Sequence, residues 1–199
     1  MTKTRLEAFS DGMFAIILTI LVLELQLPHL DDSSFAAFGA GMIQLAPKFF
    51  AFLFSFFIIA IFWINHHAIL HHVAKVDTKL LWLNIALLFF ACLFHFLTAF
   101  IGDYPLNPFV VALYPLNMTL ASIAINALWK HAYVDTNLAP NTLTSEQKNK
   151  RLRRDQMAMW MNLATAVLAF VWVPIALAII MLAPFAFVVP DILNNPAQE

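Results

Sequence analysis

Charged residues are scarce in this chain. Asp, Glu, Lys and Arg make up 12% of its 199 residues, about half the share of roughly 25% that soluble domains carry. Hydrophobic residues reach 62%, and the mean hydropathy is +0.79. A soluble domain of this size could not cover its surface with so few charges, so the excess apolar surface needs lipid. The composition therefore predicts an integral protein of the lipid bilayer.

Cysteine, glycine and net basic charge are also in short supply. Cys92 is the single cysteine and lies inside an apolar run, which excludes an internal disulfide and a cysteine zinc cluster. The four glycines form no loop that could cradle a phosphate, and no Ser–His–Asp spacing appears. A net charge of -1 leaves no basic face for a nucleic-acid backbone. We therefore expect neither an enzyme nor a nucleic-acid partner.

Apolar runs that approach the roughly 20 residues of a membrane-spanning helix divide the chain into six predicted helices, which makes the fold all-α. Pro47 suits the first turn of the second helix, and Pro174 favours a hairpin at Val173. We expect one six-helix transmembrane domain over residues 1–199, with a linker at about 130–155. The predicted helices are Phe9–Leu27, Pro47–Ile64, Leu80–Ile101, Pro108–Trp129, Gln156–Val173 and Pro174–Val189.

Basic residues predict the orientation of these helices. With six spans, ten of the eleven Lys and Arg residues fall on one side, and only Lys48 falls on the other. Loops that carry Lys and Arg stay in the cytoplasm, so we expect both termini to be cytoplasmic. The basic run in the linker is typical of contact with anionic lipid headgroups.

The first helix has two faces. It opens with the pattern R-x-x-x-F-S-D-G, which is Arg5, Phe9, Ser10, Asp11 and Gly12. At 100° per residue, an apolar strip about 60° wide runs along one side and is extended by Phe9 and Arg5. Asp11 falls about 140° away from that strip. The strip, named the aliphatic strip below, consists of Ile16, Ile20, Leu23 and Leu27.

Asp11 is costly inside a membrane helix, so it should face protein rather than lipid. Polar partners are expected at the same depth, because the second helix closes with Trp63, Asn65 and His66, and Asn84 stands near the start of the third. Two interpretations remain open at this point. Asp11 is either part of a structural polar pin that locks three helix ends together, or a group that titrates or relays ions.

These segments together resemble the transmembrane protein 175 family, the endosomal and lysosomal potassium channels with prokaryotic members. The resemblance covers essentially the whole chain, although the last two helices match only in hydropathy. Its specific part is the opening of the first helix, Arg5-x-x-x-Phe9-Ser10-Asp11-Gly12. Trp63-x-Asn65-His66-His67 and Asn84 add to it.

The resemblance implies a potassium-preferring cation channel of modest selectivity, with no T-V-G-Y-G selectivity loop and no cofactor beyond the permeant potassium ion. Prokaryotic members with one six-helix unit assemble as homotetramers in the cell membrane, with the first helices around the pore. By motif spacing, the constriction for potassium and other monovalent cations falls at Ile16, with Ile20 and Leu23 as further constrictions. Thr19 occupies the hydroxyl position that the family links to potassium preference.

Other interpretations stay open beside this one. The aliphatic strip is also compatible with ordinary helix packing, and the protein with a proton channel or a secondary cation transporter. A transporter usually has broken helices and polar groups at the midplane, which the first helix lacks. The cluster of His66, His67, His71 and His72 is too small for a di-iron enzyme. It favours polar packing at the cytoplasmic mouth, with sensitivity to pH near neutrality, over a zinc or regulatory metal site. Glu24 is compatible with two roles: it concentrates cations at the outer mouth, or it forms a plain subunit contact.

Overall fold

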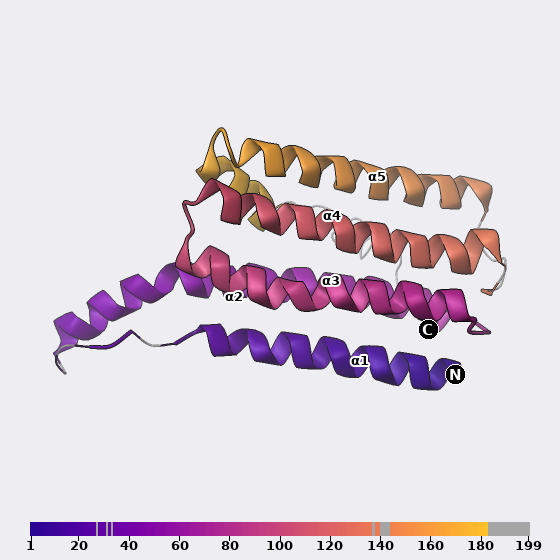
Figure 1. Cartoon of the computed structure of the whole chain (residues 1–199), viewed down its shortest axis with the longest axis horizontal. Coiled ribbons are helices and arrows are strands. Elements are labelled where there is room, and N and C mark those ends of the chain that lie inside the picture. Colours follow the sequence, from indigo (N-terminus) through magenta and orange to yellow (C-terminus); the bar gives the residue numbers. More distant parts are fainter. Residues whose placement is uncertain (27, 31, 33, 137, 140–143, 183–199) are drawn as a thin grey trace.

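The protein is a bundle of long helices. The computed structural model describes residues 1–26, 28–30, 32, 34–136, 138–139 and 144–182. Figure 1 shows α1 along one edge of the bundle and α5 along the opposite edge, with the other long helices between them. The helices are α1 (Lys3–Ile20), α2 (Phe35–His71), α3 (Thr78–Asp103), α4 (Pro108–Lys130), α5 (Ser145–Leu168) and a shorter helix at Val173–Leu182; the 3-10 turn η1 (Leu21–Glu24) follows α1, and the π-helical turn η2 (His131–Asp135) follows α4.

The predicted all-α membrane fold is confirmed, with differences at the helix ends. Four helices in the described part of the chain are long and apolar enough to span a membrane: α1 with η1, α2, α3, and α4 with η2. The fifth and sixth predicted helices are present, but the predicted hairpin at Val173 is wrong, because the chain turns at 169–171 and Val173 begins the sixth helix. The predicted helix ends at Leu27 and Val189 lie outside the described residues.

Helix α5 begins earlier than predicted. Thr144 and Gln147 form a capping box, in which each side chain accepts a bond from the other residue's backbone N–H, so the helix starts at Ser145. The second half of the segment predicted as a linker is therefore helical. Its basic residues lie on the first turns of α5, while the apolar part of the helix starts only at about Met157.

Pro47 does not begin α2 as predicted. The helix starts at Phe35, because the Ser34 side chain caps it by accepting the Ala37 N–H at 3.1 Å. Pro47 lies inside the helix, where the missing N–H and the ring disturb the preceding turn. Figure 1 shows the N-terminal part of α2 at an angle to the rest of the helix.

Beyond this bend, Lys48 lies directly against the end of α3. A Cβ atom on Gly102 would come within 3.0 Å of Lys48 Cγ and 3.3 Å of Lys48 Cα, so only glycine fits this close approach without a shift. Lys48 Nζ is 2.7 Å from Asp103 Oδ1. The bend, the glycine and the ion pair together join α2 to the end of α3.

The two ends of the bundle differ in charge. In Figure 1 the N-terminus, the α2–α3 turn, the end of α4 and the start of α5 lie at the same end, named the basic end below. The helix order places ten of the eleven Lys and Arg residues there, and Lys48, paired with Asp103, is at the opposite end. The charge segregation predicted from the sequence is therefore present in the fold.

Asp77 begins α3 at the basic end. Its carboxylate accepts the Leu80 N–H at 2.7 Å and lies 2.8 Å from Nε2 of His131, which belongs to η2. Desolvation acts to raise the pKa of Asp77, but these two hydrogen bonds, together with the electrostatic attraction of His131 and Lys79, outweigh it and hold the pKa below its usual value. The carboxylate thus caps one helix and ties it to the end of another.

Candidate pore helix and its polar contacts

One face of α1 is open in the single chain. Phe9, Ile16 and Leu23 are 50%, 56% and 64% exposed. Thr19 beside them is exposed and Ile20 is half-buried. Arg5 and Gly12 also lie on this open face, and no atom comes within 4 Å of a Cβ built on Gly12. The described residues of the aliphatic strip, Ile16, Ile20 and Leu23, therefore pack against little within their own chain, and Leu27 lies outside the described residues.

Thr19 has a defined orientation. Its hydroxyl donates to the backbone carbonyls of Ala15 and Ile16, at 2.9 Å each. Ser and Thr commonly bond back to their own helix in this way. Because the proton is engaged with the backbone, the lone pairs of the hydroxyl oxygen are what Thr19 offers to its surroundings.

The opposite face of α1 is buried against α2 and α3. Leu6, Phe14, Ile17 and Leu21 are at most 2% exposed and recur at helical spacing. Ser10 is on the same face and is fully buried. Because the rotation of α1 is fixed by this face, the aliphatic strip must point out of the subunit.

Ser10 belongs to a buried polar cluster that joins three helices. The Asn84 amide nitrogen donates to Ser10 Oγ at 3.0 Å, and Asn84 Oδ1 lies 2.7 Å from His66 Nε2. All three side chains are at most 1% exposed. Since a carbonyl oxygen can only accept, His66 carries its proton on Nε2. This cluster, named the Ser10–Asn84–His66 cluster, connects α1, α3 and α2 near the basic end.

Asp11 lies outside this cluster, which corrects its predicted placement beside Asn65, His66 and Asn84, while the predicted donor Trp63 is its partner. Its half-buried carboxylate accepts the indole N–H of Trp63 at 2.8 Å, while Asn65 donates to the carbonyl of Ile61 in its own helix. Ser10 and Asp11 are adjacent and differ by about 100° in direction, so only one of them can face Asn84. The sequence analysis named Ser10 as part of the motif but expected Asp11, and not Ser10, to contact Asn84.

The other three histidines of the predicted cluster are exposed at the end of α2; they are His67, His71 and His72. The His67 ring stacks near Trp63, with ring centroids 5.8 Å apart, and near His71 at 6.1 Å. Among the described residues, no group of three or more His, Cys, Asp or Glu side chains is arranged to hold a metal ion. These exposed histidines therefore form aromatic packing on the surface of the basic end.

Glu24 contacts its own subunit at the opposite end. Its carboxylate lies 3.2 Å from Nε2 of His95 on α3, and the two side chains are 26% and 27% exposed. This pair joins the end of the candidate pore helix to α3. It also gives His95, which stood alone in an apolar run, a polar partner.

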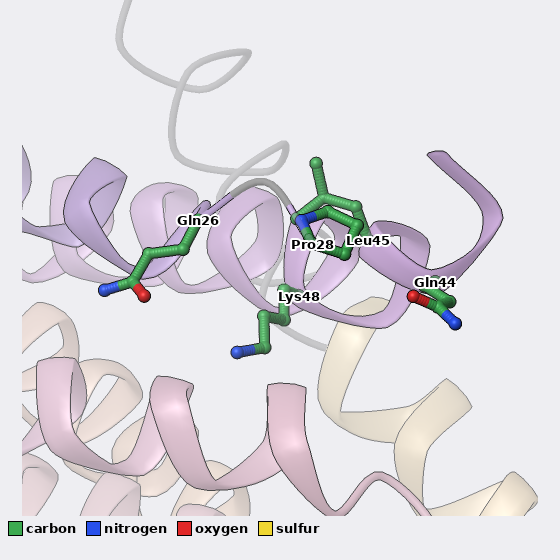
Figure 2. Close-up of a pocket in the computed structure, with 5 residues that line it drawn as sticks. All are labelled: Gln26, Pro28, Gln44, Leu45 and Lys48. Atoms are coloured by element: carbon green, nitrogen blue, oxygen red, sulfur yellow. The ribbon is translucent and has the colours of Figure 1, made fainter. Parts of the chain in front are cut away.

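A shallow pocket of about 290 Å³ lies at this same end. Figure 2 shows the Lys48 side chain between the amides of Gln26 and Gln44, below Pro28 and Leu45. Since the Lys48 ammonium is already paired with Asp103, the pocket offers only amides to a ligand, and we assign it no role.

A second polar cluster, of three hydroxyl groups, was not predicted. Ser55 Oγ accepts the Tyr114 hydroxyl at 2.8 Å and lies 2.7 Å from Thr98 Oγ1, and all three side chains are at most 1% exposed. The Tyr114 ring packs on Phe54 and Phe94, with centroids 5.2 and 5.3 Å apart. The cluster satisfies its polar atoms internally, so it stabilises the contact of α2, α3 and α4.

The fold and these contacts define a class. It is a multi-pass helical membrane protein in which one helix buries a polar cluster on one face and exposes an aliphatic strip on the other. Comparison with known proteins narrows the class. Residues 5–94 match the family described as "Endosomal/lysosomal potassium channel TMEM175". This range includes the opening of α1, the end of α2 and Asn84, which carry the sequence resemblance.

Individual relatives give the same result. The chain is 30% identical over 187 residues to a potassium channel of Chamaesiphon minutus, covering 92% of each chain. It is 43% identical over 130 residues to a potassium channel of Chryseobacterium sp. (strain P1-3), covering 64% of each chain. The crystal structure of a lysosomal potassium-selective channel TMEM175 homolog from Chamaesiphon minutus superimposes with a TM-score of 0.82 at 28% identity, covering 94% of this chain and 97% of that one.

This chain belongs to the TMEM175 family. The resemblance noted from the sequence is confirmed, as is the prediction of a multi-pass membrane protein. These relatives are ion channels and not enzymes.

Proposed function

We propose that this chain forms a potassium-preferring cation channel, in which α1 helices of four identical subunits surround a central pore. The observation that carries the proposal is the exposed aliphatic strip of α1 opposite its buried face. Identical strips that meet at a symmetry axis bury one another, as closed point-group symmetry allows. The relatives named as potassium channels support the choice of ion.

Ile16 is the proposed constriction. It lies near the centre of the strip and is 56% exposed in the single chain. A ring of its methyl groups offers no ligand to a cation, so an ion must carry water through or lose part of its hydration shell. Potassium is less strongly hydrated than sodium and crosses at a lower cost. Ile20 and Leu23 provide further apolar rings toward the opposite end.

Thr19 is the proposed selectivity-linked residue. Because its hydroxyl proton is bonded to the backbone of α1, a ring of Thr19 side chains would present oxygen lone pairs to the pore. Such oxygens can replace some of the water around a partly dehydrated cation. This assigns the energy barrier to Ile16 and part of the ion preference to Thr19.

The basic end is proposed to be cytoplasmic, in a prokaryotic cell membrane. Ten of the eleven Lys and Arg residues are there, and positive residues remain on the cytoplasmic side of a membrane. The N-terminus and, with six spans, the C-terminus are then cytoplasmic. The Glu24–His95 pair lies toward the outer mouth.

Purified protein in liposomes provides the test. The wild type should carry potassium faster than sodium, with a proton-only flux instead favouring the proton-channel alternative. Ile16→Asn should wet the constriction, raise the conductance and flatten the preference for potassium over sodium. Thr19→Ala should weaken the preference and leave the barrier in place.

Ile123→Asn is the matched control, because Ile123 is 47% exposed and lies on α4, which Figure 1 shows on the far side of α3 from α1. If Ile123→Asn changes conductance and Ile16→Asn does not, α1 does not line the pore. The assembly is tested by Leu23→Cys in a Cys92→Ser background, which should cross-link to dimers and higher species. A strictly monomeric particle in detergent and in lipid would exclude a central pore.

A further inference from the structure

Helix α5 has an exposed face that is basic in the N-terminal part of the helix and apolar in its C-terminal part. Its buried side is formed by Asn162, Thr165 and Ala166, which pack toward the bundle. The opposite side, named the outward face of α5, is exposed throughout and recurs at helical spacing. It consists of Lys150, Arg153, Met157, Trp160, Ala164 and Val167.

The charges of this region are sorted between the two sides of the helix. Arg151 turns toward the bundle, since its guanidinium lies 5.1 Å from the centre of the Trp129 ring and 3.7 Å from Asp155. Lys150 and Arg153 remain on the outward face. Glu146 is the acidic residue on the same side of the helix. It lies in the first turn of α5, one turn before Lys150. The outward face is therefore positive beside the apolar part.

The order of residues along the face matches the layers of a membrane surface. Seven residues separate Arg153 from Trp160, a rise of about 10.5 Å. Trp160 and Met157 are 65% and 62% exposed, and Val167 further along is 68% exposed. Tryptophan is enriched at membrane–water interfaces, with basic residues on the water side of it. A lipid phosphate beside Arg153 would place its acyl chains along Met157, Trp160 and Val167.

The position of α5 in the bundle leaves this face to lipid. Figure 1 shows α5 on the edge opposite α1. If α1 lines the pore, as the proposed function has it, α5 lies on the outside of the assembly. We propose that the outward face of α5 binds an anionic phospholipid of the phosphatidylglycerol class in the leaflet at the basic end, with Lys150 and Arg153 contacting its phosphate and Trp160 contacting its chains.

Native mass spectrometry of the purified full-length protein tests this directly. Titration with phosphatidylglycerol and with phosphatidylcholine should show stronger binding of the anionic lipid. The double substitution Lys150→Gln with Arg153→Gln should weaken phosphatidylglycerol binding by roughly 25-fold, at about fivefold for each charge, and leave phosphatidylcholine binding nearly unchanged. Trp160→Ala should weaken the binding of both lipids by a similar factor.

The control removes the same charge elsewhere at the basic end. Lys75→Gln with Lys79→Gln changes two exposed lysines of the α2–α3 turn and the start of α3, and it should retain most phosphatidylglycerol binding. The proposal is refuted if the control loses as much binding as the α5 variant, or if the wild type does not distinguish the two lipids. Full competition by soluble glycerol phosphate would show a free phosphate site instead, which also refutes it.

Two further measurements separate lipid binding at α5 from a contact with a second copy of the chain and from the proposed channel function. If Trp160→Cys in the Cys92→Ser background cross-links subunits, the face belongs to a second copy and not to lipid. Potassium flux of the same preparations reports on the channel independently. Flux with no lipid preference refutes the α5 site alone, while lipid preference without any flux refutes the proposed channel alone.

Discussion

The Ser10–Asn84–His66 cluster is the contact whose loss should damage the bundle most. Asn84 is fully buried, its amide bonds Ser10 Oγ at 3.0 Å, and its carbonyl oxygen lies 2.7 Å from His66 Nε2. Asn84→Ala removes both contacts and leaves two buried polar groups without a partner. Each such group costs about 1–3 kcal/mol, so we expect a loss of roughly 2–6 kcal/mol.

Asn65→Ala is the matched control. Asn65 is half-buried and donates only to the carbonyl of Ile61 in its own helix, at 2.9 Å. Its removal leaves no buried partner on another helix, so the loss should stay below about 1 kcal/mol. Both variants change an asparagine to alanine near the same end of the bundle, which makes the comparison direct.

Unfolding by titration with denaturing detergent, followed by tryptophan fluorescence, gives the free energies. Asn84→Ala should unfold at a clearly lower detergent fraction than the wild type, with Asn65→Ala close to the wild type. If the two variants lose the same stability, the cluster does not hold the three helices together. Water that enters beside His66 would lower the loss toward 2 kcal/mol, but it would not equalise the two variants.

Three more predictions follow from single contacts. Trp63→Phe removes the donor to Asp11 and should lower expression and assembly without changing ion preference, measured by size-exclusion yield and reversal potential; a changed preference would place Asp11 in the ion path. Gly102→Val should cost about 1–3 kcal/mol in detergent unfolding, because its side chain collides with Lys48; an unchanged midpoint would contradict that close packing. Ionised Asp77 stabilises the fold fully above pH about 4 and progressively less as the pH falls through its lowered pKa. Asp77→Asn should remove this acid dependence of the unfolding midpoint, and a variant with the same pH profile as the wild type would contradict it.

The sequence predicted the rotation of α1 because helical periodicity is a local property. Placing residues at 100° put Ile16 and Leu23 on one strip, and these side chains are exposed. The predicted contact between Asp11 and Asn84 was wrong for a related reason, although Trp63, another predicted partner, does donate to Asp11. A one-residue difference turns a side chain by about 100°, and which of Ser10 and Asp11 meets Asn84 depends on the packing of α1 on α3, which periodicity does not report.

Helix starts show the limit of local signals. Pro47 and Pro108 both precede apolar runs, and both suit a first helical turn. Pro108 does begin its helix, since the Asn107 side chain caps it, whereas Pro47 lies inside a helix that Ser34 caps. The cluster of Ser55, Thr98 and Tyr114 was beyond prediction, because it depends on the mutual rotation of three helices.

The most direct measurement of the central claim is thiol accessibility inside the conducting protein. In a Cys92→Ser background, Ile16→Cys should lose its potassium current when a positively charged thiol reagent is added, because the reagent fills the narrowest ring of the pore. Ile123→Cys, which changes an isoleucine of α4 that is 47% exposed in the single chain, should keep its current. If Ile16→Cys reacts with the reagent, as confirmed by mass, and the potassium current continues unchanged, α1 does not line the pore.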